Sequence, residues 1–245
     1  MKHLFPPLLP KDDLRPPVLA IAAHPDDEVI PAGAMLAWHR DQGHEVTVLH
    51  LTDGAQGDPD AKFGDIKAVR REEGREALRR LGVEDVRSLD FNDGELPETL
   101  DGITAVIREA FVEIQPQTLY SFFFSEAHRD HRAVSHAVAA ASDALPAGCR
   151  CLLFGVNQVV MGGTMFDVSD YMDRKQHALA AFKSQLEYND FALKILHRDH
   201  AATVNVEDQA VQYGELFADL SPDQMTPMLE SIEPVYRRLV GDLDS

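Results

Sequence analysis

The stretch VLAIAAHPDDEVI, residues 18–30, joins an apolar run to a cluster of polar side chains and then to a second apolar segment. Its first six residues have the continuous apolar character of a strand that is buried on both faces. From Val29 onward apolar residues recur at helical spacing as far as Gly43, a residue type that commonly ends helices. The stretch therefore predicts a buried strand, a polar loop and a helix, which together begin a β-α-β unit.

The same alternation continues along the chain. Further strands are predicted at 44–54, 85–91, 118–124 and 149–156, and further helices at 65–83, 100–116 and 130–145. Beyond residue 157 the pattern is looser, with one more short strand expected at 165–170 and helical character over 171–196. This order predicts an α/β, Rossmann-like fold, in which helices cover both faces of a mainly parallel sheet. In such folds ligands bind at the carboxyl ends of the strands.

Composition narrows the class of protein. The chain has 245 residues, a formal net charge of −18 and a pI near 4.9. Nucleic acids and anionic membrane surfaces require clustered Lys and Arg, so neither is an expected partner. No apolar stretch reaches the roughly 20 residues of a transmembrane helix, and no signal-peptide pattern is present. We expect a cytoplasmic protein, with homo-oligomer formation left open. It would have an irregular, proline-rich arm at 1–17 and a single domain over 18–245.

Three side chains have the types and positions of metal ligands: His24, Asp27 and His131. A catalytic Zn²⁺ commonly takes three protein N and O ligands and leaves one position for water. His24 and Asp27 share one loop, and His131 follows the fourth predicted strand. The alternative interpretation is a solvated loop in which Asp27 caps the next helix. Two such segments, HPDDE and HRDH, both at predicted strand ends, favour the metal site. The same ligands would also accept Fe²⁺ or cobalt.

Residues beside these ligands suggest catalytic roles. Asp26 could take a proton from a water on the metal and later give it to a leaving group. His128 could stabilise a developing oxyanion, and Asp130 could orient a histidine ligand. Glu28 is better explained as an acid in the first turn of the following helix.

The segment HRDH occurs a second time, at 197–200. This copy follows a helical pattern and no strand, so we expect it to lie away from the metal site, with His197 and His200 partly exposed. The chain contains no GxGxxG, Walker or GxSxG segment. Its two cysteines, Cys149 and Cys151, lie in a predicted strand and indicate neither a disulfide nor a catalytic thiol.

These segments resemble the PIG-L or LmbE-like zinc-dependent N-deacetylases. AHPDDE (23–28) and HRDH (128–131) match the family's hallmark segments, and weaker similarity extends from about residue 18 to 220. The resemblance implies zinc held by the three proposed ligands, with Asp26 as general base and acid and His128 as oxyanion stabiliser. It also implies substrate contacts from Arg70 and Asp93. Gln56 is a further expected contact, at a loop where the family often has an acid.

The implied reaction is removal of an N-acetyl group from an N-acetylglucosamine-type sugar, free or in a glycoconjugate. Two rival functions remain compatible with the residues. One is another metal-dependent hydrolase, such as an amidase or a phosphoesterase. The other is a non-catalytic α/β module that binds a sugar or a nucleotide.

Overall fold

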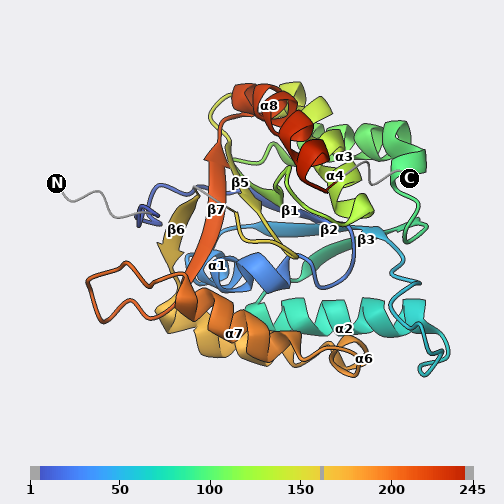
Figure 1. The fold of residues 1–245 in the computed structure, drawn as a ribbon, viewed down its shortest axis with the longest axis horizontal. Helices are drawn as coiled ribbons and strands as arrows, with labels where there is room; N and C mark the ends of the chain where they lie inside the picture. Colours follow the sequence, from blue (N-terminus) through green and yellow to red (C-terminus); the bar gives the residue numbers. More distant parts are fainter. Residues whose placement is uncertain (1–5, 161–162, 241–245) are drawn as a thin grey trace.

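The computed structural model describes residues 6–160 and 163–240, which form one seven-stranded sheet with helices around it (Figure 1). The strand order is β3-β2-β1-β4-β5-β7-β6. The first five strands in this order pair in parallel, and β7 runs antiparallel to both of its neighbours. The strands are β1 (Val18–Ala22), β2 (Val46–Thr52), β3 (Asp85–Phe91), β4 (Thr118–Phe122), β5 (Arg150–Phe154), β6 (Thr164–Asp167) and β7 (Gly214–Leu220). The predicted α/β fold with a mainly parallel sheet is confirmed.

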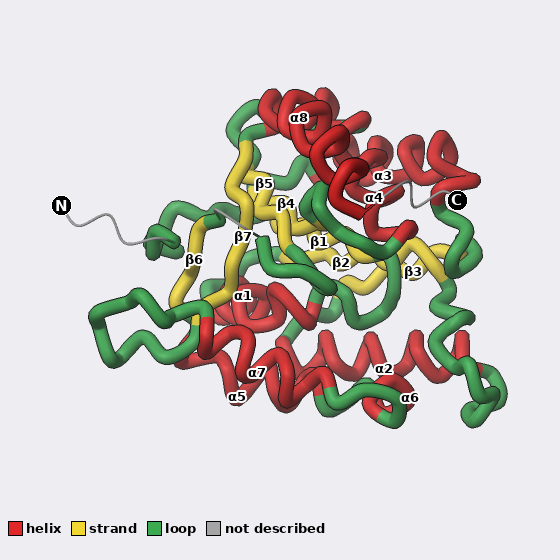
Figure 2. The backbone as a smooth tube through the Cα atoms, viewed as in Figure 1, coloured by secondary structure: helices red, strands yellow, loops and turns green. Residues whose placement is uncertain are grey.

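Helices cover both faces of this sheet, as Figure 2 shows. One layer contains α1 (Val29–Asp41), α2 (Ile66–Leu81), α5 (Met172–Leu179), the short α6 (Lys183–Leu186) and α7 (Phe191–Ala201). The other layer contains α3 (Leu100–Ile114), α4 (Arg129–Ala140) and α8 (Pro222–Val240). Short 3₁₀ helices lie at Pro97–Thr99, Ser142–Ala144 and Ser169–Tyr171. No helix in the described ranges is both long enough and apolar enough to cross a membrane.

Strand β1 occupies the centre of the sheet, between β2 and β4. Val18 lies opposite Val46 of β2 on one side and Thr118 of β4 on the other. Every residue of β1 is buried, because helices cover the strand on both faces. The continuous apolar run over residues 18–23 is therefore explained by this central position. The loops after β1 and β4 consequently leave the sheet side by side.

Both ends of α2 follow simple capping chemistry. The side chain of Asp65 accepts a hydrogen bond from the Ala68 N–H and so caps the start of α2. The same helix ends at Gly82, whose φ of 86° is a left-handed conformation that glycine adopts without strain. Gly43, two residues after α1, likewise has a positive φ.

The structure differs from the sequence prediction mainly after residue 157. The single helical segment expected over 171–196 is divided into α5, α6 and α7, and Asp190 starts the last of these by capping the Leu193 N–H. Strand β7 and helix α8 were not predicted. Two internal prolines, Pro227 and Pro234, obscure the helical pattern of α8. In the arm, described from residue 6, Leu9 donates a backbone hydrogen bond to Met165 of β6.

Candidate functional site

A cleft of about 760 Å³ opens at the carboxyl ends of β1 to β5. Its floor carries the polar residues that follow these strands, and its outer wall is formed by α6, α7 and the loop between them. The floor includes His24, Asp26, Asp27, Gln56, Gly57, Arg70, Asp93, His128, His131 and Asn157. The wall includes Gln185, Tyr188, Asn189, Phe191, Lys194, Ile195 and Arg198.

The three proposed metal ligands come together at the floor of this cleft. Each of His24, Asp27 and His131 offers one ligand atom, and these atoms lie within 4.8 Å of one another. The Asp27 carboxylate lies between the two imidazoles: its Oδ2 is 3.0 Å from His24 Nδ1, and its Oδ1 is 3.2 Å from His131 Nε2. All three side chains are buried. Two nitrogens and one carboxylate oxygen form a donor set of the kind that catalytic zinc uses.

The charges in this cluster also fit a cation. Burial lowers the pKa of His24, but Asp27 and hydrogen bonds to neighbouring carboxylates outweigh burial and hold that pKa well above its usual value. Burial also lowers the pKa of His131, but Asp27 and Glu126 outweigh burial and raise that pKa to about 9. The two imidazoles hold the pKa of Asp27 well below its usual value, against the effect of burial. The carboxylates thus attract positive charge to this point, which a divalent ion would supply in place of protons.

A second group of possible ligands consists of His24, His128 and Asp130. His24 Nε2 lies 3.3 Å from Asp130 Oδ2. However, both oxygens of Asp130 already accept backbone hydrogen bonds, from Gly94 at 2.7 Å and from Leu96 at 3.2 Å. This carboxylate therefore ties the loop after β3 to α4 and lies behind His24, a placement that suits the orienting role considered from the sequence.

Glu126 is a site residue that the sequence analysis did not identify. Its Oε2 lies 2.6 Å from His131 Nδ1, on the side of the ring away from Asp27, and the carboxylate is buried. Its Oε1 accepts the N–H groups of Val156 at 2.9 Å and Asn157 at 3.2 Å. A carboxylate in this position fixes the orientation and tautomer of a histidine ligand. In the sequence, the signal for this role is an acidic residue five positions before His131. Many acidic residues at such positions lie on the protein surface, so the signal is weak.

Asp26 is held in a strained conformation beside the metal cluster. Its φ of 148° is rare for a residue with a side chain, and such strain is found most often at functional sites. Burial raises the pKa of Asp26 to about 6, although the charge of Arg70 acts in the opposite direction. The Arg70 Nη2 donates to Asp26 Oδ2 at 3.2 Å. The structure therefore places a buried carboxylate with an elevated pKa next to the proposed ligands.

The three expected substrate contacts, Arg70, Asp93 and Gln56, all line the cleft. They also contact one another: the Gln56 N–H donates to Asp93 Oδ2 at 2.9 Å, and Arg70 Nη1 lies 3.8 Å from the same oxygen. Gly57 lies so close to this arginine that a Cβ there would approach Arg70 Nη1 to 2.6 Å. Arg70 is therefore held in place by neighbouring groups of the protein, and its guanidinium faces Asp26, the proposed base.

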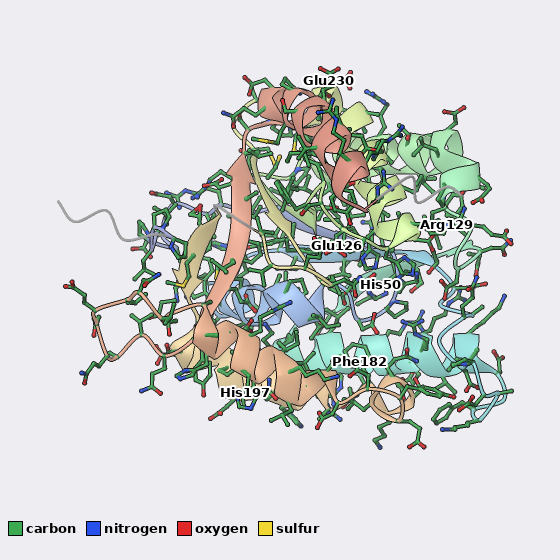
Figure 3. All side chains as sticks on the ribbon, in the orientation of Figure 1. His50, Glu126, Arg129, Phe182, His197 and Glu230 are labelled. Atoms are coloured by element: carbon green, nitrogen blue, oxygen red, sulfur yellow. The ribbon has the colours of Figure 1, made fainter. Side chains whose placement is uncertain are left out.

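Glu28 differs from the simple helix-start acid that was expected. It immediately precedes α1, but its carboxylate is fully buried and lies 3.1 Å from His50 Nε2. His50 and Glu126 are both buried, whereas His197 lies at the outer side of α7 in Figure 3. His197 and His200 are exposed, and neither belongs to a potential metal-binding group within residues 6–160 and 163–240.

A family model and several known proteins match this chain. The family model described as PIG-L, GlcNAc-PI de-N-acetylase, matches residues 19–142. The probable N-acetyl-alpha-D-glucosaminyl L-malate deacetylase 2 of Bacillus cereus is 31% identical over 200 residues, which cover 75% of this chain and 91% of that protein. Diacetylchitobiose deacetylase of Thermococcus kodakarensis is 38% identical over 122 residues, covering 47% of this chain and 45% of that protein.

A solved structure extends the similarity through most of the fold. N,N′-diacetylchitobiose deacetylase from Pyrococcus horikoshii superimposes with a TM-score of 0.69 at 26% sequence identity. The superposition covers 86% of this chain and 85% of that chain. The likeness is thus not confined to the two short motifs.

Proposed function

Because the chain belongs to the PIG-L family of de-N-acetylases, we propose that it removes the N-acetyl group from an N-acetylglucosamine-type sugar in a zinc-dependent hydrolysis. The observation that carries the proposal is the cluster of His24, Asp27 and His131 at the floor of the cleft, with Asp26 beside it. The named relatives are deacetylases of N-acetylated sugars. The donor set and the low pKa of Asp27 support a divalent cation at this point.

Each group has one task in the proposed reaction. Zinc held by His24, Asp27 and His131 would lower the pKa of a water molecule toward about 7 and polarise the acetyl carbonyl. Asp26 accepts the proton of the attacking water as the new C–O bond forms. Asp26 then gives that proton to the sugar nitrogen as the C–N bond breaks, so the products are acetate and a free amine. The side chain of His128 lines the cleft and donates a hydrogen bond to the carbonyl oxygen as its negative charge develops.

A panel of N-acetylated sugars tests this function directly. We expect free amine and acetate in equal amounts from at least one N-acetylglucosamine conjugate. We also expect loss of turnover with a chelator and recovery on adding Zn²⁺, with Fe²⁺ and Co²⁺ compared in parallel. Sugar binding without amine release in zinc-replete buffer would support the non-catalytic alternative. Release of phosphate from sugar phosphates would support a phosphoesterase.

The geometry already disfavours a two-metal phosphoesterase. The two potential metal-binding groups in the described residues share His24, so they cannot both be filled independently. Two-metal phosphoesterases hold two ions about 3.5–4 Å apart, which takes more ligands than these overlapping groups offer. One metal per chain by elemental analysis is therefore expected, and two would favour the rival.

Replacing Arg70 is expected to change the pH dependence of the reaction. The base must be deprotonated, so kcat/KM should fall as the pH drops through the pKa of Asp26. In wild type this limb should lie at or below about pH 6, because a bound cation lowers the pKa further. Arg70→Gln removes the guanidinium 3.2 Å from Asp26, so the limb should move up by about one pH unit or more.

Arg70→Lys is the matched control, because it keeps a positive charge near the carboxylate. Its acid limb should stay closer to that of wild type. An acid limb that is the same in Arg70→Gln and wild type would contradict the assignment of this limb to Asp26.

A residue of the cleft wall suggests which kind of chemical group is attached to the sugar of the substrate. Lys194 lines the cleft from α7 and donates to the neutral side chain of Asn189. The cleft arginines are instead paired with acids: Arg70 with Asp26, and Arg198 with its neighbour on α7. Within the described part of the chain no carboxylate pairs with Lys194. An unpaired cation in a protein of net charge −18 favours a substrate with an anionic substituent, as malate has and a second sugar lacks.

Lys194→Met should therefore lower kcat/KM for N-acetylglucosaminyl malate by about two- to fivefold, the size of an exposed ion pair. The effect should shrink at high salt. Turnover of diacetylchitobiose should not change. Lys183→Met is the control, because Lys183 is exposed on α6 and does not line the cleft. Equal losses on both substrates would exclude recognition of an anionic group by Lys194.

A further inference from the structure

The second HRDH segment contains an arginine with an unusual set of contacts. Arg198 lines the cleft, and its guanidinium donates to three backbone carbonyls from two separate elements. Its Nη2 reaches Ile30 of α1 at 3.0 Å, and its Nη1 reaches Gly155 at 3.3 Å and Val156 at 3.4 Å. Its Nε donates to Asp199 at 3.3 Å. One side chain of α7 thus connects α1 to the loop that follows β5.

The same loop is held from its other side by Glu126. The carbonyls of residues 155 and 156 accept from Arg198, while the N–H groups of Val156 and Asn157 donate to the Glu126 carboxylate. The loop is also tightly folded, since a Cβ on Gly155 would lie 1.9 Å from the carbonyl oxygen of Gln158. Glu126 in turn contacts His131. Arg198 and the proposed metal ligand are therefore linked through one short backbone segment.

Buried charges fix Arg198 in place. Asp199 is almost fully buried and accepts from Lys175 Nζ at 2.5 Å. Lys175 is fully buried and also donates to Glu215 Oε1 at 2.6 Å. Glu215 accepts the N–H groups of Ala34 and Met35 in α1. A buried ion cluster is weak support for stability, but it defines geometry closely. This cluster holds α7 against α1 and so aims Arg198 at the loop.

We infer that Arg198 is a positioning residue of the active site. It holds residues 155–157 so that Glu126 stays in place to orient His131, and it keeps Val156 and Asn157 in the lining of the cleft. The second HRDH segment thus serves the same site as the first, without binding the metal. The inference deepens the proposed function, on which its metal-affinity prediction rests. Its prediction about the loop backbone does not depend on that function.

Arg198→Met tests the inference, because methionine keeps an unbranched apolar side chain and removes every donor. The control is Arg150→Met, since Arg150 also pairs with an acid and is similarly buried, but lies at the start of β5 and does not line the cleft. We expect faster amide hydrogen exchange at Val156 and Asn157 in Arg198→Met than in Arg150→Met, whether or not zinc is present. If Arg198→Met does not fold, Arg198→Lys carries the same comparison.

Zinc affinity by chelator competition provides the second measurement. Loss of a residue behind a metal ligand typically weakens metal binding about 10- to 100-fold. We expect zinc affinity to fall by this range in Glu126→Gln. In Arg198→Met it should fall about tenfold, because Arg198 reaches His131 only through the loop and Glu126. The double variant should lose less than the product of the two single effects, because both act through one segment.

The outcomes separate the inference from the proposed function. Unchanged exchange at residues 155–157 in Arg198→Met would overturn the inference, as would fully multiplicative losses of zinc affinity. A wild-type chain that binds no zinc would instead contradict the proposed function. The exchange comparison would still decide whether Arg198 positions the loop.

Discussion

Asp26→Asn is expected to lower kcat by about 10²–10⁴-fold, the usual contribution of a general acid and base. Asparagine has the same shape as aspartate and its side-chain oxygen can still accept from Arg70, but it cannot take a proton at neutral pH. The ligand atoms are untouched, so zinc should remain bound at one per chain. The measurement combines steady-state kinetics on the best N-acetylated sugar with elemental analysis of the purified variant.

Asp53→Asn is the matched control for this variant. Asp53 is a buried acid directly after β2 that pairs with Lys67 at 2.6 Å, but it does not line the cleft. Its replacement removes a comparable charge without touching the proposed reaction path, so kcat should stay near the wild-type value. Near-normal turnover of a fully zinc-loaded Asp26→Asn enzyme would show that another group moves the proton.

The meeting of the two motifs could be predicted because of the sheet order. His24 and Asp27 lie in one loop, whereas His131 is over a hundred residues away in the chain. Strands β1 and β4 are direct neighbours, so the loops that follow them are adjacent. Strand and helix patterns sufficed to place both motifs at the same edge of the sheet, although no pattern specified the distances.

Other parts of the site could not be predicted from local patterns. Glu126 and Asn157 act through contacts between the loops after β4 and β5, and an isolated acid or amide carries no spacing signal. The lack of a preceding strand predicts that the second HRDH segment, with Arg198, lies away from the site. The strand ends do not reveal the position of α7, which packs against α1 and forms part of the outer wall of the cleft. Such packing depends on the folded chain as a whole.

The electrostatic state of His128 explains how it can act near neutral pH. His128 is the N-cap of α4, and its Nδ1 accepts the Asp130 N–H at 3.2 Å. Partial burial and the neighbouring His131 lower the pKa of His128. The lowered pKa favours the neutral imidazole, and the tautomer that accepts the Asp130 N–H at Nδ1 carries its proton on Nε2. A neutral donor does not lose its proton as the pH rises above 7, unlike an imidazolium.

His128→Ala should accordingly lower kcat by about 10²–10³-fold, the cost of losing one oxyanion donor. It also removes a helix cap, which costs about 1 kcal/mol of stability and complicates interpretation. His128→Asn separates the two effects, because asparagine is a good N-cap but is too short to present a donor where imidazole Nε2 does. We expect His128→Asn to unfold near the wild-type temperature and still show most of the loss in kcat, with KM changed little. Wild-type turnover in that variant would mean that the metal alone stabilises the oxyanion, and that His128 serves only to start α4.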